Sequence, residues 1–145
     1  MSADSVLRAA KSVVVIDWPS RDVPESLVRA GYAVVVKGGP GPDTYARWDA
    51  KGGVVATHPP GGPPAHADLV YAYRPLAELS AVLAIAQIVG AGSVWLHLDQ
   101  PSVAEIRTAQ EVVEAAGLTL VVDSEIAARA DALSPGAAEG RAPDA

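Results

Sequence analysis

Short apolar runs alternate along the chain with longer segments in which apolar residues recur every three or four positions. The short runs are rich in β-branched residues and predict strands over 12–16, 33–37, 53–57, 68–73, 93–98 and 118–123. The first, second and sixth runs are almost continuously apolar, which is typical of strands covered on both faces. The longer segments have helical periodicity and predict helices over 23–31, 76–92 and 102–117.

Glycine, proline and serine mark the ends of the predicted helices. Gly31, Gly90 and Gly117 each follow a helical segment and precede a strand, where glycine is favoured as a C-terminal cap. Pro24 suits a first helical turn, and Ser102 suits an N-cap. These signals support the boundaries between helices and strands.

The alternation of strands and helices predicts βαβ units and therefore a mainly parallel sheet. We expect one three-layer α/β/α, Rossmann-like domain over residues 1–132, with five or six strands and with strands 12–16 and 68–73 adjacent. Within residues 38–66, "KGGPGP" and "HPPGGPPAHA" predict loops, and "DTYARWDA" between them predicts a helical turn. The composition of residues 133–145 predicts a disordered tail.

Composition limits the classes of partner. Half of the 145 residues are hydrophobic, 19% are charged, and the formal net charge is -6 without any basic run. Nucleic-acid binding requires a concentrated positive surface, so we expect no nucleic-acid partner. The chain has no cysteine, which excludes disulfides and thiolate chemistry. The stretch "MSADSVLRAAKS" is too weakly apolar for a signal peptide, and no run approaches 18 apolar residues, so we expect a cytoplasmic protein without a membrane partner.

Four stretches within about residues 8–130 carry a family resemblance. They are "AKSVVVI", "AGYAVVVKGGP", "ADLVYAYRPLAEL", and "GAGSVWLHL" together with "AAGLTLVVDSEI". These stretches resemble the small single-domain CoA-binding-like Rossmann proteins, which are related to the CoA-binding domain of succinyl-CoA synthetase. The resemblance implies a Rossmann-like fold, with CoA or a related nucleotide as the ligand.

Residues at the expected binding edge depart from the pattern of that family. Asp17 stands where the family has a glycine that lets backbone amides approach a diphosphate, and the loop that follows is shorter. His97 replaces a glutamine, Asp99 a glycine, and Ser124 a cysteine. A carboxylate facing a diphosphate costs about 1 kcal/mol or more at an effective dielectric constant of ~20. Because open α/β sheets bind ligands at the carboxyl ends of their strands, these changes allow a ligand other than CoA.

Two pairs of polar residues at these strand ends are candidates for catalysis or binding. Arg74 would hold an anion while Asp17 orients the anion or accepts a proton; alternatively, the two residues form a plain ion pair. His97 and Asp99 are two positions apart, so both side chains point to one side of an extended strand. They would act as acid and base, or His97 would serve as a hydrogen-bonding residue at the strand end.

The first turn and the neighbouring strand ends supply the other candidate ligand contacts. Trp18 would stack on a planar ligand or close a pocket; alternatively, it caps the end of the sheet or packs against "DTYARWDA". Ser20 and Arg21 precede a helix N-terminus, where anions are favoured, but Asp22 and Glu25 in the same turn would compete with an anion. Lys37 ends the second strand, where it would meet a nucleotide or remain solvated, and Tyr73 completes the predicted ligand-binding set.

Other histidines and aromatic residues give weaker signals. His58, His66 and His97 come from separate segments without metal-ligand spacing, so we expect no metal cofactor. Tyr45 and Trp48 are three positions apart, on one face of the predicted helical turn. They would pack beneath the long loop or form a lid over the crevice.

Three functions are compatible with the sequence. The first is a small-molecule binding module for a nucleotide-type or acyl-carrying anion. The second is a cofactor-independent enzyme that uses Asp17, His97 or Asp99 in a cyclisation, dehydration or isomerisation. The third is a scaffold with a vestigial crevice that forms a homodimer through the apolar helix 76–89.

Overall fold

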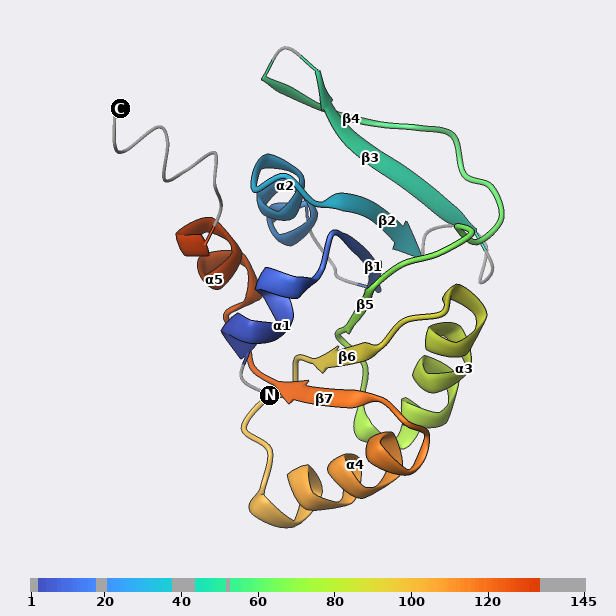
Figure 1. Ribbon diagram of the computed structural model, residues 1–145, viewed down its shortest axis with the longest axis vertical. Helices are drawn as coiled ribbons and strands as arrows, with labels where there is room; N and C mark the ends of the chain where they lie inside the picture. Colours follow the sequence, from blue (N-terminus) through green and yellow to red (C-terminus); the bar gives the residue numbers. More distant parts are fainter. Residues whose placement is uncertain (1–2, 18–20, 38–43, 52, 134–145) are drawn as a thin grey trace.

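The structure, a computed structural model, describes residues 3–17, 21–37, 44–51 and 53–133. In these residues a seven-stranded sheet has the order β4-β3-β2-β1-β5-β6-β7 (Figure 1). Its strands are β1 (Ser12–Ile16), β2 (Ala33–Lys37), β3 (Tyr45–Lys51), β4 (Val54–Thr57), β5 (Leu69–Ala72), β6 (Ser93–Leu96) and β7 (Thr119–Val122). The helices are α1 (Ala3–Ala9), α2 (Asp22–Arg29), the 3-10 helix η1 (Leu76–Glu78), α3 (Leu79–Val89), α4 (Val103–Ala115) and α5 (Ile126–Leu133).

The predicted α/β class and mainly parallel sheet are confirmed. Strands β2, β1, β5, β6 and β7 run parallel, and β1 lies between β2 and β5 as the sequence predicted. α1 was not predicted, because its seven residues bury only Val6 and Leu7 and show little periodicity. Leu133 belongs to α5 rather than to the predicted tail, whose other residues lie outside the described part of the chain.

The sheet has seven strands rather than five or six because "DTYARWDA" contributes a strand instead of the predicted helical turn. This strand, β3, pairs antiparallel with β2 and β4, with Trp48 opposite Val34 on one side and Thr57 on the other. Residues three apart in a strand point to opposite faces. Tyr45 and Trp48 accordingly belong to different hydrophobic clusters, so the prediction that they share a face was wrong.

Helices cover both faces of the sheet and enclose two separate hydrophobic clusters. Val13 and Val15 of β1 pack in a cluster with residues of α1, α2 and α5. Val14 and Ile16 pack in the other cluster with residues of α3 and α4. Because successive strand residues alternate between faces, one continuous apolar run fills both clusters.

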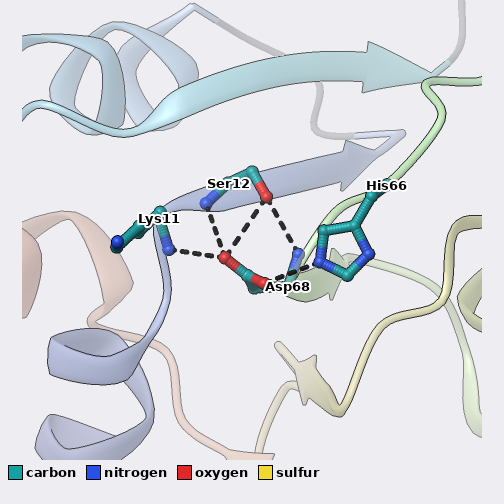
Figure 2. Close-up of polar contacts among 4 residues, drawn as sticks. All are labelled: Lys11, Ser12, His66 and Asp68. Atoms are coloured by element: carbon teal, nitrogen blue, oxygen red, sulfur yellow. Dashed lines mark hydrogen bonds and ion pairs between the residues drawn. The ribbon is translucent and has the colours of Figure 1, made fainter.

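A polar cluster holds β1 against β5 at the amino edge of the sheet (Figure 2). Oδ2 of Asp68 accepts hydrogen bonds from the backbone N–H groups of Lys11, at 2.8 Å, and Ser12, at 3.3 Å. Oδ1 of Asp68 lies 2.8 Å from Nε2 of His66, and the Asp68 N–H donates to Ser12 Oγ at 3.0 Å. The hydrogen bond with His66, followed by that from Lys11, lowers the pKa of Asp68.

Candidate ligand cleft at the carboxyl edge of the sheet

A cleft of about 400 Å³ opens at the carboxyl ends of β1, β5 and β6. β1 is flanked by β2, which follows it in the chain, and by β5, so the cleft lies where the strand order reverses. Ligands of open α/β sheets bind at such a switch point. The cleft is lined by Asp17, Tyr73, Arg74, Pro75, His97, Leu98 and Asp99. The structure thus brings together five of the predicted site residues.

Asp17 occupies the turn that leaves β1. Its φ of 56° lies in the left-handed region, which favours glycine but which aspartate also adopts. Its backbone N–H donates to the carbonyl of Lys37 at 3.0 Å, which fixes the turn beside β2. The aspartate therefore keeps the backbone conformation of a glycine position and adds a carboxylate at the cleft.

Arg74 follows β5 and is bracketed by two carboxylates. Its Nε donates to Oε1 of Glu78 at 3.0 Å, and its Nη2 contacts both carboxylate oxygens of Glu78. Nη1 of Arg74 lies 3.7 Å from Oδ2 of Asp17. The hydrogen bond with Glu78 is the main cause of a raised pKa of Arg74, so the guanidinium stays charged. Its charge is offset by these two neighbours.

His97 lies between two tyrosines. The Tyr71 hydroxyl is 2.7 Å from Nδ1 of His97, and the Tyr73 ring meets the imidazole edge-on with 4.9 Å between ring centroids. The Tyr73 hydroxyl donates to Oδ2 of Asp99 at 3.3 Å. Burial raises the pKa of Tyr71 well above its ordinary value, so this phenol stays protonated. Tyr73 therefore contacts both residues, His97 through its ring and Asp99 through its hydroxyl.

The other predicted ligand contacts do not line this cleft or lie outside the described residues. The Arg21 guanidinium lies 4.6 Å from the centre of the Trp48 ring and pairs with Glu25 at 2.8 Å. Lys37 ends β2 and contributes the carbonyl that accepts from Asp17. Trp18 and Ser20 lie outside the described residues.

Two residues of the site were missed by sequence reasoning. Glu78 is four positions after Arg74, a spacing that predicts an ion pair on a helical turn. Tyr71 looked like an ordinary strand residue, because it lies inside an apolar run. Its hydroxyl gains its role only from the pairing of β5 with β6, which places His97 within reach.

The described residues contain neither a metal-ligand cluster nor a membrane-spanning helix. No group of three or more His, Cys, Asp or Glu side chains in this part of the chain is arranged to hold a metal ion. His58 and His66 instead pair with Asp49 and Asp68, each at 2.8 Å. Among the same residues no helix has the length and apolar character needed to cross a bilayer.

Comparison with known proteins reveals similar folds. No family model and no curated protein matches the chain. Prb, a PH1109 protein redesigned for binding, is 20% identical over 90% of this chain and 88% of its own, with a TM-score of 0.59. Cell-free ID.343 from Thermus thermophilus is 22% identical over 89% of this chain and 94% of its own, with a TM-score of 0.53. An uncharacterized protein is 12% identical over 86% of this chain and 98% of its own, with a TM-score of 0.54. At these identities the likenesses establish a shared fold.

Proposed function

We propose that the protein is a small-molecule binding module of the CoA-binding-like, three-layer Rossmann type. Its ligand is a nucleotide-type or acyl-carrying anion, held in the cleft at the carboxyl edge of the sheet. The observation that carries this proposal is the convergence of Asp17, Arg74 and His97 from the ends of three parallel strands at the switch point. On this proposal the protein works in the cytoplasm without a metal, nucleic-acid or membrane partner.

The charges of the cleft narrow the choice of ligand. Arg74 supplies a guanidinium, whose planar fork suits phosphate and carboxylate oxygens. Asp17, Glu78 and Asp99 bring negative charge to the same region, which opposes an unshielded diphosphate. CoA is therefore one candidate among several nucleotide-type ligands, and the ligand must make further contacts with the cleft.

Thermal unfolding in the presence of CoA, acetyl-CoA, NAD and ADP tests the proposal. A ligand at 100 times its dissociation constant adds about 2.7 kcal/mol of stability, which is a shift of several degrees. We expect Arg74→Gln to reduce that shift and Arg107→Gln, a matched change of an exposed arginine on α4, to preserve it. Absence of a saturable shift with all four compounds would count against the proposal.

Acid–base catalysis in the same cleft is the second candidate function. It is favoured by the hydrogen bonds that hold His97 through Tyr71 and Asp99 through Tyr73, because both groups would meet a bound substrate in fixed positions. Once a substrate is found, we expect His97→Ala and Asp17→Asn to abolish turnover without unfolding the protein. Full activity in both variants would exclude this mechanism.

The predicted homodimer stays a separate proposal. Helix α3 carries no acidic residue in its first turn and no basic residue in its last, and Ile88 on it is 60% exposed. Sedimentation at several protein concentrations would measure association, and a monomer at all of them would contradict the dimer.

A further inference from the structure

We infer that Glu78 is a built-in competitor that sets which anions reach Arg74 in the cleft. The inference rests on the proposed function, because it assigns Arg74 to an anionic ligand. Glu78 ends η1, one turn after Arg74, so the chain itself keeps its carboxylate close to the guanidinium. A ligand must therefore replace a tethered carboxylate before it can pair with Nε and Nη2 of Arg74.

The contacts of Glu78 are those that a ligand phosphate or carboxylate would make. Its oxygens engage Nε and Nη2 of Arg74, which form the side of the guanidinium that binds oxyanions in a two-bonded manner. The remaining nitrogen, Nη1, faces Asp17. Within the described residues each nitrogen of the guanidinium thus lies near a carboxylate, and an anion that binds Arg74 through Nε and Nη2 must displace Glu78.

The surroundings of Glu78 favour competition over a structural role. Glu78 occupies the N-cap position of α3, yet its side chain makes no hydrogen bond to the helix backbone. The side chain is 43% exposed and that of Arg74 is 34% exposed, so water reaches the pair. Such pairs change an equilibrium by a factor of about five or less, so a ligand with additional contacts can displace Glu78.

The ion pair between Arg74 and Glu78 therefore influences which anions can bind in the cleft. A small monovalent anion without further contacts gains little by exchanging with Glu78. An oxyanion with two oxygens that match the guanidinium fork, carried on a larger molecule that fills the cleft, replaces the lost contacts and adds its own. Because this competition lowers the affinity of every such anion by the same factor, only a phosphate or carboxylate that belongs to a larger ligand keeps a useful affinity for the cleft.

Calorimetric titration of the purified protein tests this inference with CoA and with inorganic pyrophosphate. We expect Glu78→Gln to bind CoA about threefold to fivefold tighter than the unaltered protein does. Glu111→Gln removes an exposed carboxylate from α4, outside the cleft, and should leave the affinity unchanged. Pyrophosphate should bind poorly to the unaltered protein, because it lacks the rest of the ligand, and should gain by about the same factor as CoA from Glu78→Gln.

The outcomes separate the inference from the proposed function. The competitor role is overturned if Glu78→Gln binds CoA no more tightly than the unaltered protein, or if Glu111→Gln gains as much affinity as Glu78→Gln. In either case, weaker CoA binding by Arg74→Gln still supports the anion site. Unchanged binding in Arg74→Gln overturns the anion site itself. If neither probe binds the unaltered protein or Glu78→Gln, the competitor role fails, while the thermal test with all four compounds still decides the proposed function.

A measurement on the ligand-free protein tests whether Glu78 holds the guanidinium of Arg74. In the ligand-free protein the Nε–H proton resonance of Arg74 should shift on Glu78→Gln and stay in place in Glu111→Gln. An unshifted resonance would show that Glu78 does not hold the guanidinium, and it would overturn the inference.

Discussion

Asp68 should contribute a large share of the stability of the amino edge of the sheet, and its replacement by alanine tests this directly. Its carboxylate accepts from the backbone N–H groups of Lys11, just before β1, and of Ser12, the first residue of β1, and it pairs with His66 (Figure 2). Asp68 itself directly precedes β5. The side chain therefore links segments more than 50 residues apart, as the sequence separations of 57 and 56 to Lys11 and Ser12 show.

The size of the effect follows from these contacts. Hydrogen bonds to a charged group contribute about 1.5–3 kcal/mol each when well buried. The Asp68 side chain is 34% exposed and the contact with Lys11 is exposed, so water replaces part of the loss. We expect Asp68→Ala to lower the free energy of unfolding by about 2–3 kcal/mol in total, or the melting temperature by roughly 4–12 °C. Asp68→Asn keeps one acceptor oxygen and should cost about 1 kcal/mol.

The effect should depend on pH in a defined direction. The hydrogen bonds from His66 and Lys11 lower the pKa of Asp68 in the folded state. A lowered pKa means that the folded state favours the carboxylate, so its contribution is fully present above the unfolded pKa of about 4. The contribution is lost as the pH falls from there through the folded pKa. The stability difference between the unaltered protein and Asp68→Asn should therefore shrink below about pH 4.

Urea unfolding at neutral and acid pH, followed by circular dichroism, measures these differences. Glu111→Gln serves as the control, because it removes an exposed carboxylate on α4. A loss in Asp68→Ala no larger than that of the control would refute the structural role of the cluster. A difference between Asp68→Asn and the unaltered protein that persists unchanged in acid would refute the electrostatic part.

Three single contacts elsewhere in the fold can be tested by the same unfolding measurements. Ser102→Ala removes the capping box of α4, in which Ser102 and Glu105 exchange hydrogen bonds of 2.8 and 3.1 Å, and should cost about 1 kcal/mol; no measurable loss would contradict it. Asp17→Ala should be about 1 kcal/mol less stable than Asp17→Gly, because φ is 56°; equal stability would argue against the left-handed turn. Tyr71→Phe removes the 2.7 Å contact with His97 and should cost about 1 kcal/mol at neutral pH. Because the raised pKa of Tyr71 favours the neutral phenol in the folded state, its contribution should be lost as the pH rises above about 10, and an unchanged difference in alkali would contradict this.

The parallel part of the sheet was predictable because its strands are short, mostly apolar runs. In β1, whose side chains are buried on both faces, the run is continuous Val and Ile, and helices with glycine at their ends separate the strands. β3 was not predictable by the same means, because its two aromatic residues are three positions apart, a spacing that also fits a helical turn. Its strand conformation depends on the pairing of Trp48 with Val34, a tertiary contact that local spacing does not reveal.

The location of the cleft was predictable, whereas its charge balance was not. The rule that ligands bind at the carboxyl ends of parallel strands placed Asp17, Arg74 and His97 together, as the structure finds. The sequence did not show that Glu78 pairs with Arg74, because charged residues four positions apart are common on helical turns and many of them make no such pair. It also gave no sign that Tyr71 reaches His97, since that contact requires the register between β5 and β6.

The separation of the interior by the sheet has a consequence for how the protein can change. Tyr71, which holds His97, belongs to the same compartment as α1, α2 and α5, while α3 and α4 rest in the other. Changes in side-chain volume beneath α3 and α4 therefore act on the face of the sheet opposite Tyr71, the residue that contacts His97. Variation beneath these two helices can therefore accumulate without a direct effect on the contact between Tyr71 and His97.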